Sequence, residues 1–577
     1  MKKKIYSIFA AVPMALAVVS CNFLDVDPEV ITDGNFYNSE QEVIYGLAGV
    51  YGVINSEEFY GNNYSLMLSN TDDLCYYNRT TANNYSVWYR HDASSPEIYS
   101  AWTMIYRGVN NANAFMEAVQ DSEFDQDHKY YNEARFLRAY YHFILAQAWG
   151  DIPVRKTAVT ELGTDETNCP ATPQLQALQW VASEMEACLD LADTELTNAP
   201  SRITRYTILG ILSRVYLFMA GETVSGNDSY KHEYFGKARD YADMVITEAG
   251  EEGSNILYLN PSYSQFFINM IEDVYDPHES LWEADFMGNR SSSDNWSNGR
   301  IGDLIGLQST ADVGTYDEVN CNYAYGQYNG SMKLWNLYWT EDRTDDEDEL
   351  QDDEAAGWDA RQAWNMPPYN YAGGSFTAGG VTTTWRGGID KTPYRVSPNT
   401  TFDVPTIARG VRNCGKYRRE TIYEGVKGDR GTFTPINYPI LRYSDVLLMY
   451  AEASNEYEGP TQRAYDMVKK VRDRAGIKTR DYSEYSSQEA FRQFIRNERG
   501  RELCFESLRK YDLIRWGIFV DAMKGYIPDT QDTDWGTGNT AGVASSTASA
   551  VQARHIVLPI PSIELGVNAD LVQNPLW

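Results

Sequence analysis

Histidine and cysteine, which often carry nucleophilic or metal-assisted catalysis, are scarce in this chain of 577 residues. It has six scattered histidines and seven cysteines. No HExxH or GxSxG motif occurs, which argues against the common zinc peptidases and serine hydrolases. The cysteines form no CxxC pair, so most are expected to be small buried residues. Their spacing does not decide whether any two of them form a disulfide.

Basic residues are too few to balance the acidic ones. The chain has 49 lysines and arginines against 81 aspartates and glutamates, which gives a formal net charge of −32. A surface this acidic repels the phosphates of nucleic acids and anionic lipids, so neither is an expected partner. A neutral ligand is compatible with this charge.

Long hydrophobic runs are missing except near the N-terminus. Residues 5–19 are apolar and follow three lysines at positions 2–4. This run is shorter than the roughly 20 residues that cross a membrane, so it predicts a signal peptide over residues 1–20. Its end, VVSC at residues 18–21, resembles a bacterial lipobox, which implies that Cys21 is lipidated and anchors the mature chain. The alternative is an ordinary secretory signal followed by an incidental cysteine.

Three segments of different texture follow the predicted signal. Residues 21–250 and 441–577 show helical periodicity, whereas residues 251–440 are rich in Gly, Asn, Asp, Tyr and Trp. Helices are expected to start near Ser39 and Ser95 and to cover residues 134–148, 173–191, 205–219, 234–249, 442–455, 461–474 and 489–509, with strand and turn over 552–577. Because the helices recur in pairs, the predicted fold is mainly α, a tetratricopeptide-like superhelical scaffold with a large loop-rich inserted lobe.

Several ordered motifs then point to one family. They are FLDVDP at 23–28, EARFLRAYY at 133–141, WGDIP at 149–153, ESLW at 279–282, YPILRYSDVLLMYAEA at 438–453, VRDRAG at 471–476, NERGRELCFE at 497–506, RKYDLIRW at 509–516, PIP at 559–561 and QNP at 573–575. Together they resemble the SusD/RagB family of outer-membrane nutrient-binding lipoproteins along the whole chain. The resemblance implies a cell-surface protein, held in the outer membrane, that captures oligo- or polysaccharide and delivers it to a SusC-like TonB-dependent transporter.

The charged residues of these motifs are expected to be structural. Glu498 with Arg501, and Glu506 with Arg509 or Lys510, are spaced to pair along a helix. His142 lies among apolar helix residues and is expected to be buried rather than catalytic.

Two further patterns partly match a nucleotide-binding motif and a calcium-binding loop. Residues 410–416 spell most of a phosphate-binding loop, but Tyr417 replaces the Ser or Thr that would hold magnesium, so no nucleotide site is expected. The acidic run at 342–354 could hold calcium, yet it lacks EF-hand spacing, and a solvated loop is the favoured interpretation. No cofactor is otherwise predicted.

Aromatic residues are abundant, with 43 tyrosines, 14 tryptophans and 20 phenylalanines. Aromatic rings dock the flat C–H faces of sugars, and polar side chains bind the hydroxyls. Segments 72–90 and 289–298 combine both ingredients, and the resemblance places the ligand surface in these regions. The predicted ligand-binding residues are Asp73, Arg79, Trp88, Tyr89, Trp296 and Tyr325, with no catalytic residue. The alternative for any one of these aromatics is a place in the core.

Two other functions remain open from the sequence. One is a cell-surface glycoside hydrolase, because 81 acidic residues will place some pair at a suitable separation by chance. The other is SusD-like capture of a non-sugar nutrient such as a peptide.

Overall fold

The structure is a computed structural model. It describes residues 36–82, 84–159, 167–192, 200–224, 229–288, 297, 299–308, 324–338, 359–367, 374–378, 381–385, 410, 412–419, 433–525 and 539–577. The predicted signal peptide, Cys21, Trp296 and the acidic run at 342–354 lie outside these residues.

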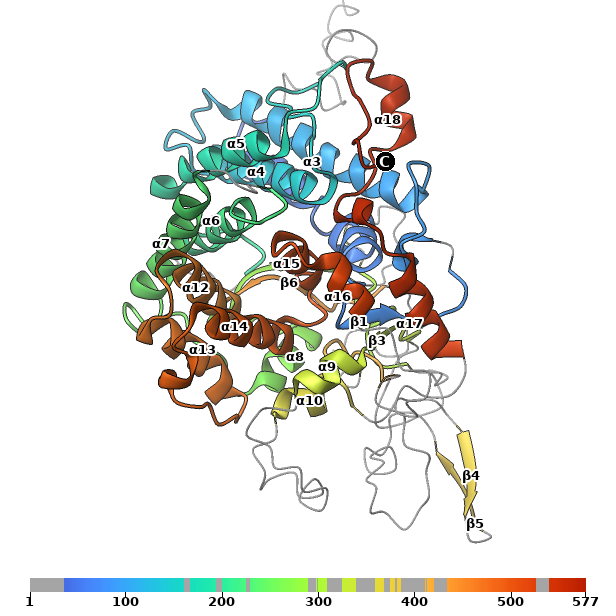
Figure 1. Cartoon of the computed structure of the whole chain (residues 1–577). Coiled ribbons are helices and arrows are strands. Elements are labelled where there is room, and N and C mark those ends of the chain that lie inside the picture. The colour runs from blue at the N-terminus through green and yellow to red at the C-terminus, as the bar shows by residue number, and fades with distance from the viewer. Residues whose placement is uncertain are drawn as a thin grey trace, which may run out of the picture.

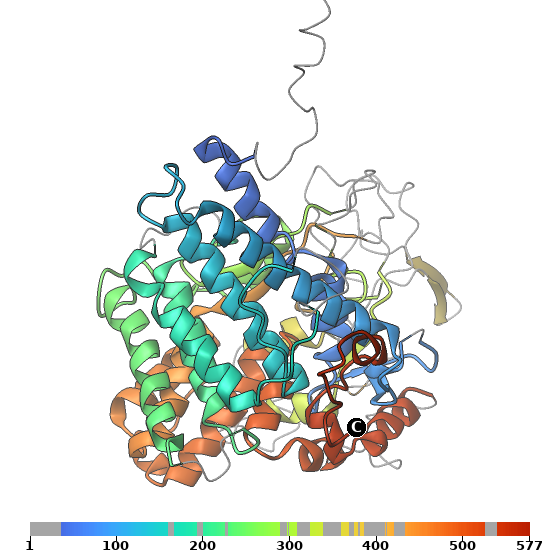
Figure 2. The ribbon, with the colours of Figure 1, turned by 90° about the horizontal axis from the view of Figure 1, so that it is seen from above.

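A continuous row of helices forms the scaffold. Its members are α2 (Glu40–Tyr51), α3 (Pro96–Val119), α4 (Lys129–Trp149), α5 (Gln174–Glu186), α6 (Arg205–Met219), α7 (Lys231–Glu248), α12 (Tyr443–Glu458), α13 (Gln462–Arg474) and α14 (Gln488–Leu503). Each helix packs against the next, and α7 packs on α12 although residues 249–442 separate them in the sequence. Figure 2 shows the blue-to-green helices continuing into the orange ones around one body. This arrangement confirms the mainly α, tetratricopeptide-like fold class.

Helix α6 shows how local sequence sets these elements. The Thr204 hydroxyl accepts a hydrogen bond from the Thr207 amide, and the Thr207 hydroxyl accepts one from the Thr204 amide. This reciprocal cap satisfies donors that a helix start leaves unpaired, and the helix begins where the sequence predicted. A Cβ added to Gly210 would meet the Leu441 side chain at 2.6 Å, so glycine lets the strand β6 (Tyr438–Arg442) pass close to the helix.

Short elements fill the segment between α7 and α12. They are α8 (Tyr263–Ile271), β2 (Ser280–Ala284), β3 (Tyr328–Gly330), α9 (Met332–Leu337), α10 (Ala360–Asn365), β4 (Gly374–Ala378), β5 (Val381–Trp385) and β6 (Tyr438–Arg442). Among the described residues, short antiparallel pairs form between β2 and β6, between β4 and β5, and between β3 and β1 (Cys75–Tyr77). Figure 1 shows α8, α9 and α10 below α14.

The C-terminal part differs from prediction in three places. The helix expected over 489–509 stops at Leu503, because Phe505 (φ 66°) and Ser507 (φ 57°) adopt left-handed conformations before α15 (Arg509–Arg515). The tail, predicted as strand and turn, instead contains a 3-10 helix (Ala553–Ile556) and α18 (Ser562–Val567). Between α15 and this tail, the sequence did not predict α16 (Phe519–Gly525) or α17 (Asn539–Ala550). Helix α17 is made of small residues, which give no bulky apolar stripe.

Buried ion pairs join the inserted segment to the scaffold. Arg442, at the end of β6, contacts Glu279 at 2.8 Å, Glu502 at 3.0 Å and Glu506 at 2.7 Å, and all four side chains are at most 2% exposed. Arg474 at the end of α13 bonds Glu279 at 3.0 Å and Glu502 at 2.5 Å. Glu279 precedes β2, so one cluster fixes β2, β6, α13 and α14 together.

A second group of pairs extends this cluster to α10. Arg361 contacts Asp359 at 2.8 Å, Glu498 at 2.7 Å and Glu502 at 2.9 Å. Burial would raise the pKa of Glu498, but Arg361 and its neighbouring arginines lower it to about 2. The predicted Glu498–Arg501 pair is confirmed at 3.0 Å.

The pairing predicted for Glu506 is wrong. Its carboxylate contacts Arg442 and Lys416, whereas Arg509 binds Asp73 and Lys510 donates to the Leu68 carbonyl. The break after Leu503 explains the difference, because Glu506 and Arg509 do not share one helix.

We predict that Arg442→Met lowers the free energy of unfolding by about 3–5 kcal/mol, because it leaves buried carboxylates without their cation. The matched control is Lys469→Gln, which removes an exposed pair with Asp473 and should cost under about 1 kcal/mol. Urea unfolding followed by circular dichroism measures both. Equal losses for the two variants would contradict the role given to the buried cluster.

Candidate ligand site

An open hollow of about 360 Å³ lies between the segment after β1 and helix α17. It is lined by Arg79, Thr80, Trp88, Arg90, Gly542, Val543 and Ser546. Helix α17 packs against β1 and the 3-10 helix η3 (Ser86–Trp88), and Figure 1 shows it beside β1 and β3. The hollow therefore combines two segments more than 400 residues apart in the sequence.

Strand pairing brings Arg79 and Tyr325 together. In the β1–β3 sheet Tyr77 lies opposite Tyr328, so the residues after β1 run beside those before β3. The Arg79 guanidinium donates to the Tyr325 carbonyl at 2.5 Å, and the Asn78 amide donates to the Gly326 carbonyl at 2.8 Å. Arg79 and Tyr325, which were both predicted to bind ligand, are therefore neighbours although they are far apart in the sequence.

A tight turn separates Trp88 from Tyr89. The Tyr85 carbonyl accepts from the amides of Trp88 and Arg90, and Tyr89 takes a left-handed conformation with φ 55°. Trp88 consequently lines the hollow, whereas Tyr89 points into the core and its hydroxyl donates to the Thr71 carbonyl. We correct the sequence-based assignment accordingly and do not place Tyr89 in the site.

Trp88 is the buried anchor of an aromatic group at the surface. Its side chain is only 7% exposed, and its ring lies 5.9 Å from Tyr77 and 6.2 Å from Tyr85. Tyr85 is 56% exposed and Tyr325 is 40% exposed. The described lining of the hollow thus includes the Trp88 indole, while Tyr85 contacts that ring and the Tyr325 carbonyl accepts from Arg79 beside it. Tyr85 was missed from the sequence, although it belongs to the same aromatic segment.

Asp73 is an interior residue. Its carboxylate contacts Arg509 at 2.9 Å and Lys333 at 2.6 Å, and its side chain is fully buried. Burial alone would raise the pKa of Asp73, but these two cations lower it below its usual range. Because the carboxylate is committed to the core, we correct the assignment of Asp73 as a ligand-binding group.

The described tryptophan side chains of the inserted segment pack in or against the core and are not exposed at the surface. Trp282 and Trp335 belong to the core, and Trp364 is partly buried against it. Trp296 lies outside the described residues, so its predicted role in stacking a sugar remains a prediction.

Residues 278–577 match the model of the SusD family, and residues 22–217 match a family model described as "Starch-binding associating with outer membrane". The chain belongs to the SusD family. SusD-like protein P2 of Formosa agariphila is 24% identical over 585 aligned residues, which cover 97% of each chain.

Solved structures of SusD proteins share the fold. A SusD homolog from Bacteroides thetaiotaomicron has a TM-score of 0.75 and 22% identity, covering 94% of this chain and 98% of that chain. A protein described as a laminarin binding SusD-like protein has a TM-score of 0.64 and 18% identity, covering 94% of this chain and 100% of that chain. At these identities the likeness concerns the fold.

In this SusD-family chain, the lysine of the phosphate-loop-like motif and His142 are both buried in the fold. Lys416, the lysine of the phosphate-loop-like motif, is buried and donates to the carbonyls of Glu502 and Cys504. His142 is fully buried, and desolvation lowers its pKa to about 3. The cysteines at 75, 169, 188, 414 and 504 are free.

Within the described part of the chain, no group of three or more His, Cys, Asp or Glu side chains is placed to hold a metal ion. The acidic run considered for calcium lies outside the described residues. None of the described helices combines the length and apolarity that crossing a membrane requires.

Substitutions of Asp73 and Arg79, two of the predicted site residues, should differ in their effect on the free energy of unfolding. Asp73→Asn leaves the buried Arg509 without its carboxylate, so we expect a loss of about 3–5 kcal/mol in the free energy of unfolding. Arg79→Gln changes a half-buried surface residue and should stay within about 0.5 kcal/mol. Urea unfolding of both variants tests this division, and a neutral Asp73→Asn would overturn it.

Proposed function

We propose that this chain captures an oligo- or polysaccharide at the cell surface, in the hollow between the β1–η3 segment and α17. The observation that carries the proposal is the placement of Trp88, with Tyr85 and Tyr325 nearby, beside two arginines in one open hollow. An aromatic face suits the C–H face of a sugar, and guanidinium N–H groups donate to its oxygens. Membership of the SusD family and the laminarin-binding name of a neighbour in fold support this proposal.

The proposal is capture without hydrolysis. A glycosidase needs two carboxyl groups separated by about 5–5.5 Å or 6.5–9.5 Å across the scissile bond. The described lining of the hollow contains neither Asp nor Glu. Arginine and indole groups can hold a sugar, but they supply no general acid and nucleophile pair for glycoside cleavage.

We place the protein at the outer membrane, anchored by lipid on Cys21. The lipobox-like VVSC sequence and the family description "Starch-binding associating with outer membrane" support this location. Onward delivery to a SusC-like TonB-dependent transporter completes the proposal. Such delivery requires release, so we expect a modest affinity for the glycan.

Native affinity gels that contain different polysaccharides test capture, with protein that starts after Cys21. At least one glycan should retard the protein without new reducing ends. Tyr85→Ala should weaken that retention about threefold to tenfold, because it removes one exposed aromatic contact. Tyr230→Ala is the matched control, since Tyr85 and Tyr230 are both 56% exposed and Tyr230 lies at the start of α7.

The outcomes separate the alternatives. Reducing ends that appear on incubation would indicate a hydrolase. Absence of retention by every glycan, combined with binding of peptides, would contradict glycan capture and indicate another nutrient. Equal weakening by Tyr85→Ala and Tyr230→Ala would move the site away from the hollow.

The anchor and the transporter need a separate test in cells. Cys21→Ala should shift the protein from the membrane fraction to the soluble fraction, because the lipid is the proposed attachment. Affinity purification of the wild-type protein from detergent-solubilised outer membranes should recover a TonB-dependent barrel. A Cys21→Ala protein that stays in the membrane fraction, or a purification without a barrel, would contradict the corresponding part of the proposal.

A further inference from the structure

The hollow departs from the charge of the rest of the chain. The whole protein has 81 acidic against 49 basic residues, so an average surface patch carries more acid than base. The described lining of the hollow has the opposite balance, because it contains Arg79 and Arg90 and no acidic residue. The positive charge of the described lining is therefore a local feature that the overall composition does not explain.

Among the described residues, each of the two arginines of the hollow has one hydrogen-bond acceptor. Arg79 donates to the Tyr325 carbonyl and Arg90 donates to the Ser546 hydroxyl, each through one N–H at 2.5 Å. A guanidinium carries five N–H donors, so these single bonds orient the groups without saturating them. Over the described part of the chain, neither guanidinium has a carboxylate within 4.0 Å.

The interior arginines show the contrast. Arg361, Arg442 and Arg515 each contact two or more carboxylates. Among the described residues, Arg79 and Arg90 instead have neutral acceptors, the Tyr325 carbonyl and the Ser546 hydroxyl. Within this part of the chain no carboxylate neutralises the two arginines that line the hollow, so their charge can meet a ligand.

An anionic substituent suits this arrangement better than a hydroxyl. The planar guanidinium fork matches two oxygens of a carboxylate or sulfate, and such charge-assisted bonds are roughly twice as strong as neutral ones. Trp88 lies in the same lining with 7% of its side chain exposed, so its indole is the aromatic group that a sugar ring can contact there. The negative charge elsewhere on the protein acts weakly here, because the Debye length is about 8 Å at physiological ionic strength.

We propose that the hollow selects acidic glycans, with the sugar ring on Trp88 and its carboxylate or sulfate group on Arg79 and Arg90. This inference rests on the proposed function and names the chemical class of its ligand. A carboxylate and a sulfate share the chemistry that the two arginines recognise. The choice between them is a matter for experiment.

Titration calorimetry with two matched pairs of polymers tests the inference. Polygalacturonate is compared with its fully methyl-esterified form, and dextran sulfate is compared with dextran. The protein should bind at least one acidic polymer at least tenfold more tightly than its neutral partner, and added salt should weaken that binding. Arg79→Gln and Arg90→Gln should each weaken it about tenfold, the size expected for one lost charge-assisted hydrogen bond.

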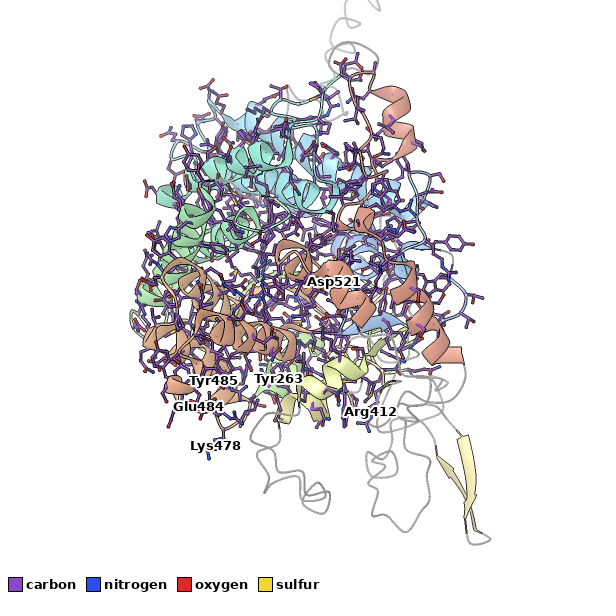
Figure 3. The ribbon with its side chains drawn as sticks, in the orientation of Figure 1. Tyr263, Arg412, Lys478, Glu484, Tyr485 and Asp521 are labelled. Carbon is purple, nitrogen blue, oxygen red and sulfur yellow. The ribbon has the colours of Figure 1, made fainter. Side chains whose placement is uncertain are left out.

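Arg480→Gln is the control for overall charge. Arg480 lies beside Glu484 at 3.5 Å, in the segment between Lys478 and Glu484, which Figure 3 labels away from α17. This variant removes the same charge outside the hollow and should leave the affinity within twofold of wild type. Unfolding curves for the three variants confirm that each one is folded.

Each result has a distinct meaning. Binding of polygalacturonate alone identifies a carboxylate ligand, binding of dextran sulfate alone identifies a sulfate ligand, and binding of both supports a general anion site. Binding that ignores esterification and sulfation, and that Arg79→Gln and Arg90→Gln leave unchanged, overturns the acidic class while glycan capture stands. Failure to bind any polysaccharide, acidic or neutral, overturns both proposals.

Discussion

Buried pairs between arginine and carboxylate residues hold this structure in register. Removing two charges from water costs several kcal/mol for each ion, and this cost is offset only when partners meet with good geometry. Arg442, Glu279 and Glu502 come from three separate parts of the chain and satisfy one another inside the protein. Tyr263, labelled in Figure 3 near α14, packs its ring 5.1 Å from Arg474 of the same cluster. The inserted segment is therefore fixed to the helical row by contacts that tolerate little displacement.

The same kind of contact positions the segments that form the candidate ligand site. Asp73 immediately precedes the β1 region and is held by Arg509 of α15 and Lys333 of α9. Strand β1 then pairs with β3, and the segment after it carries Arg79 and Trp88 to the surface. Asp73 thus acts as a positioning residue for the hollow. The groups that would meet a ligand are a buried indole and two oriented guanidiniums, so little side-chain freedom would be lost on binding.

Local sequence signals predicted the scaffold well. The bounds of α6 follow from the Thr204 cap and an apolar pattern, both of which are encoded within a few residues. The fate of Asp73 depended on Arg509, more than 400 positions away, and no local pattern reveals such a partner. Tyr89 was misassigned because a single left-handed residue reverses the direction of neighbouring side chains. Helix α17 was missed because small residues carry little periodicity. Residue type and the family resemblance together suggested Arg79, Trp88 and Tyr325, and their ligand-binding role stays a prediction.

The most direct test of the account is amide hydrogen exchange of the protein with and without polygalacturonate. The account predicts that slowed exchange concentrates in residues 78–90 and 539–550, the two walls of the hollow. Arg79→Gln should reduce that protection while exchange in α6 and α12 stays unchanged. Protection confined to other segments, with both walls exchanging as in the free protein, would contradict the placement of the ligand in this hollow.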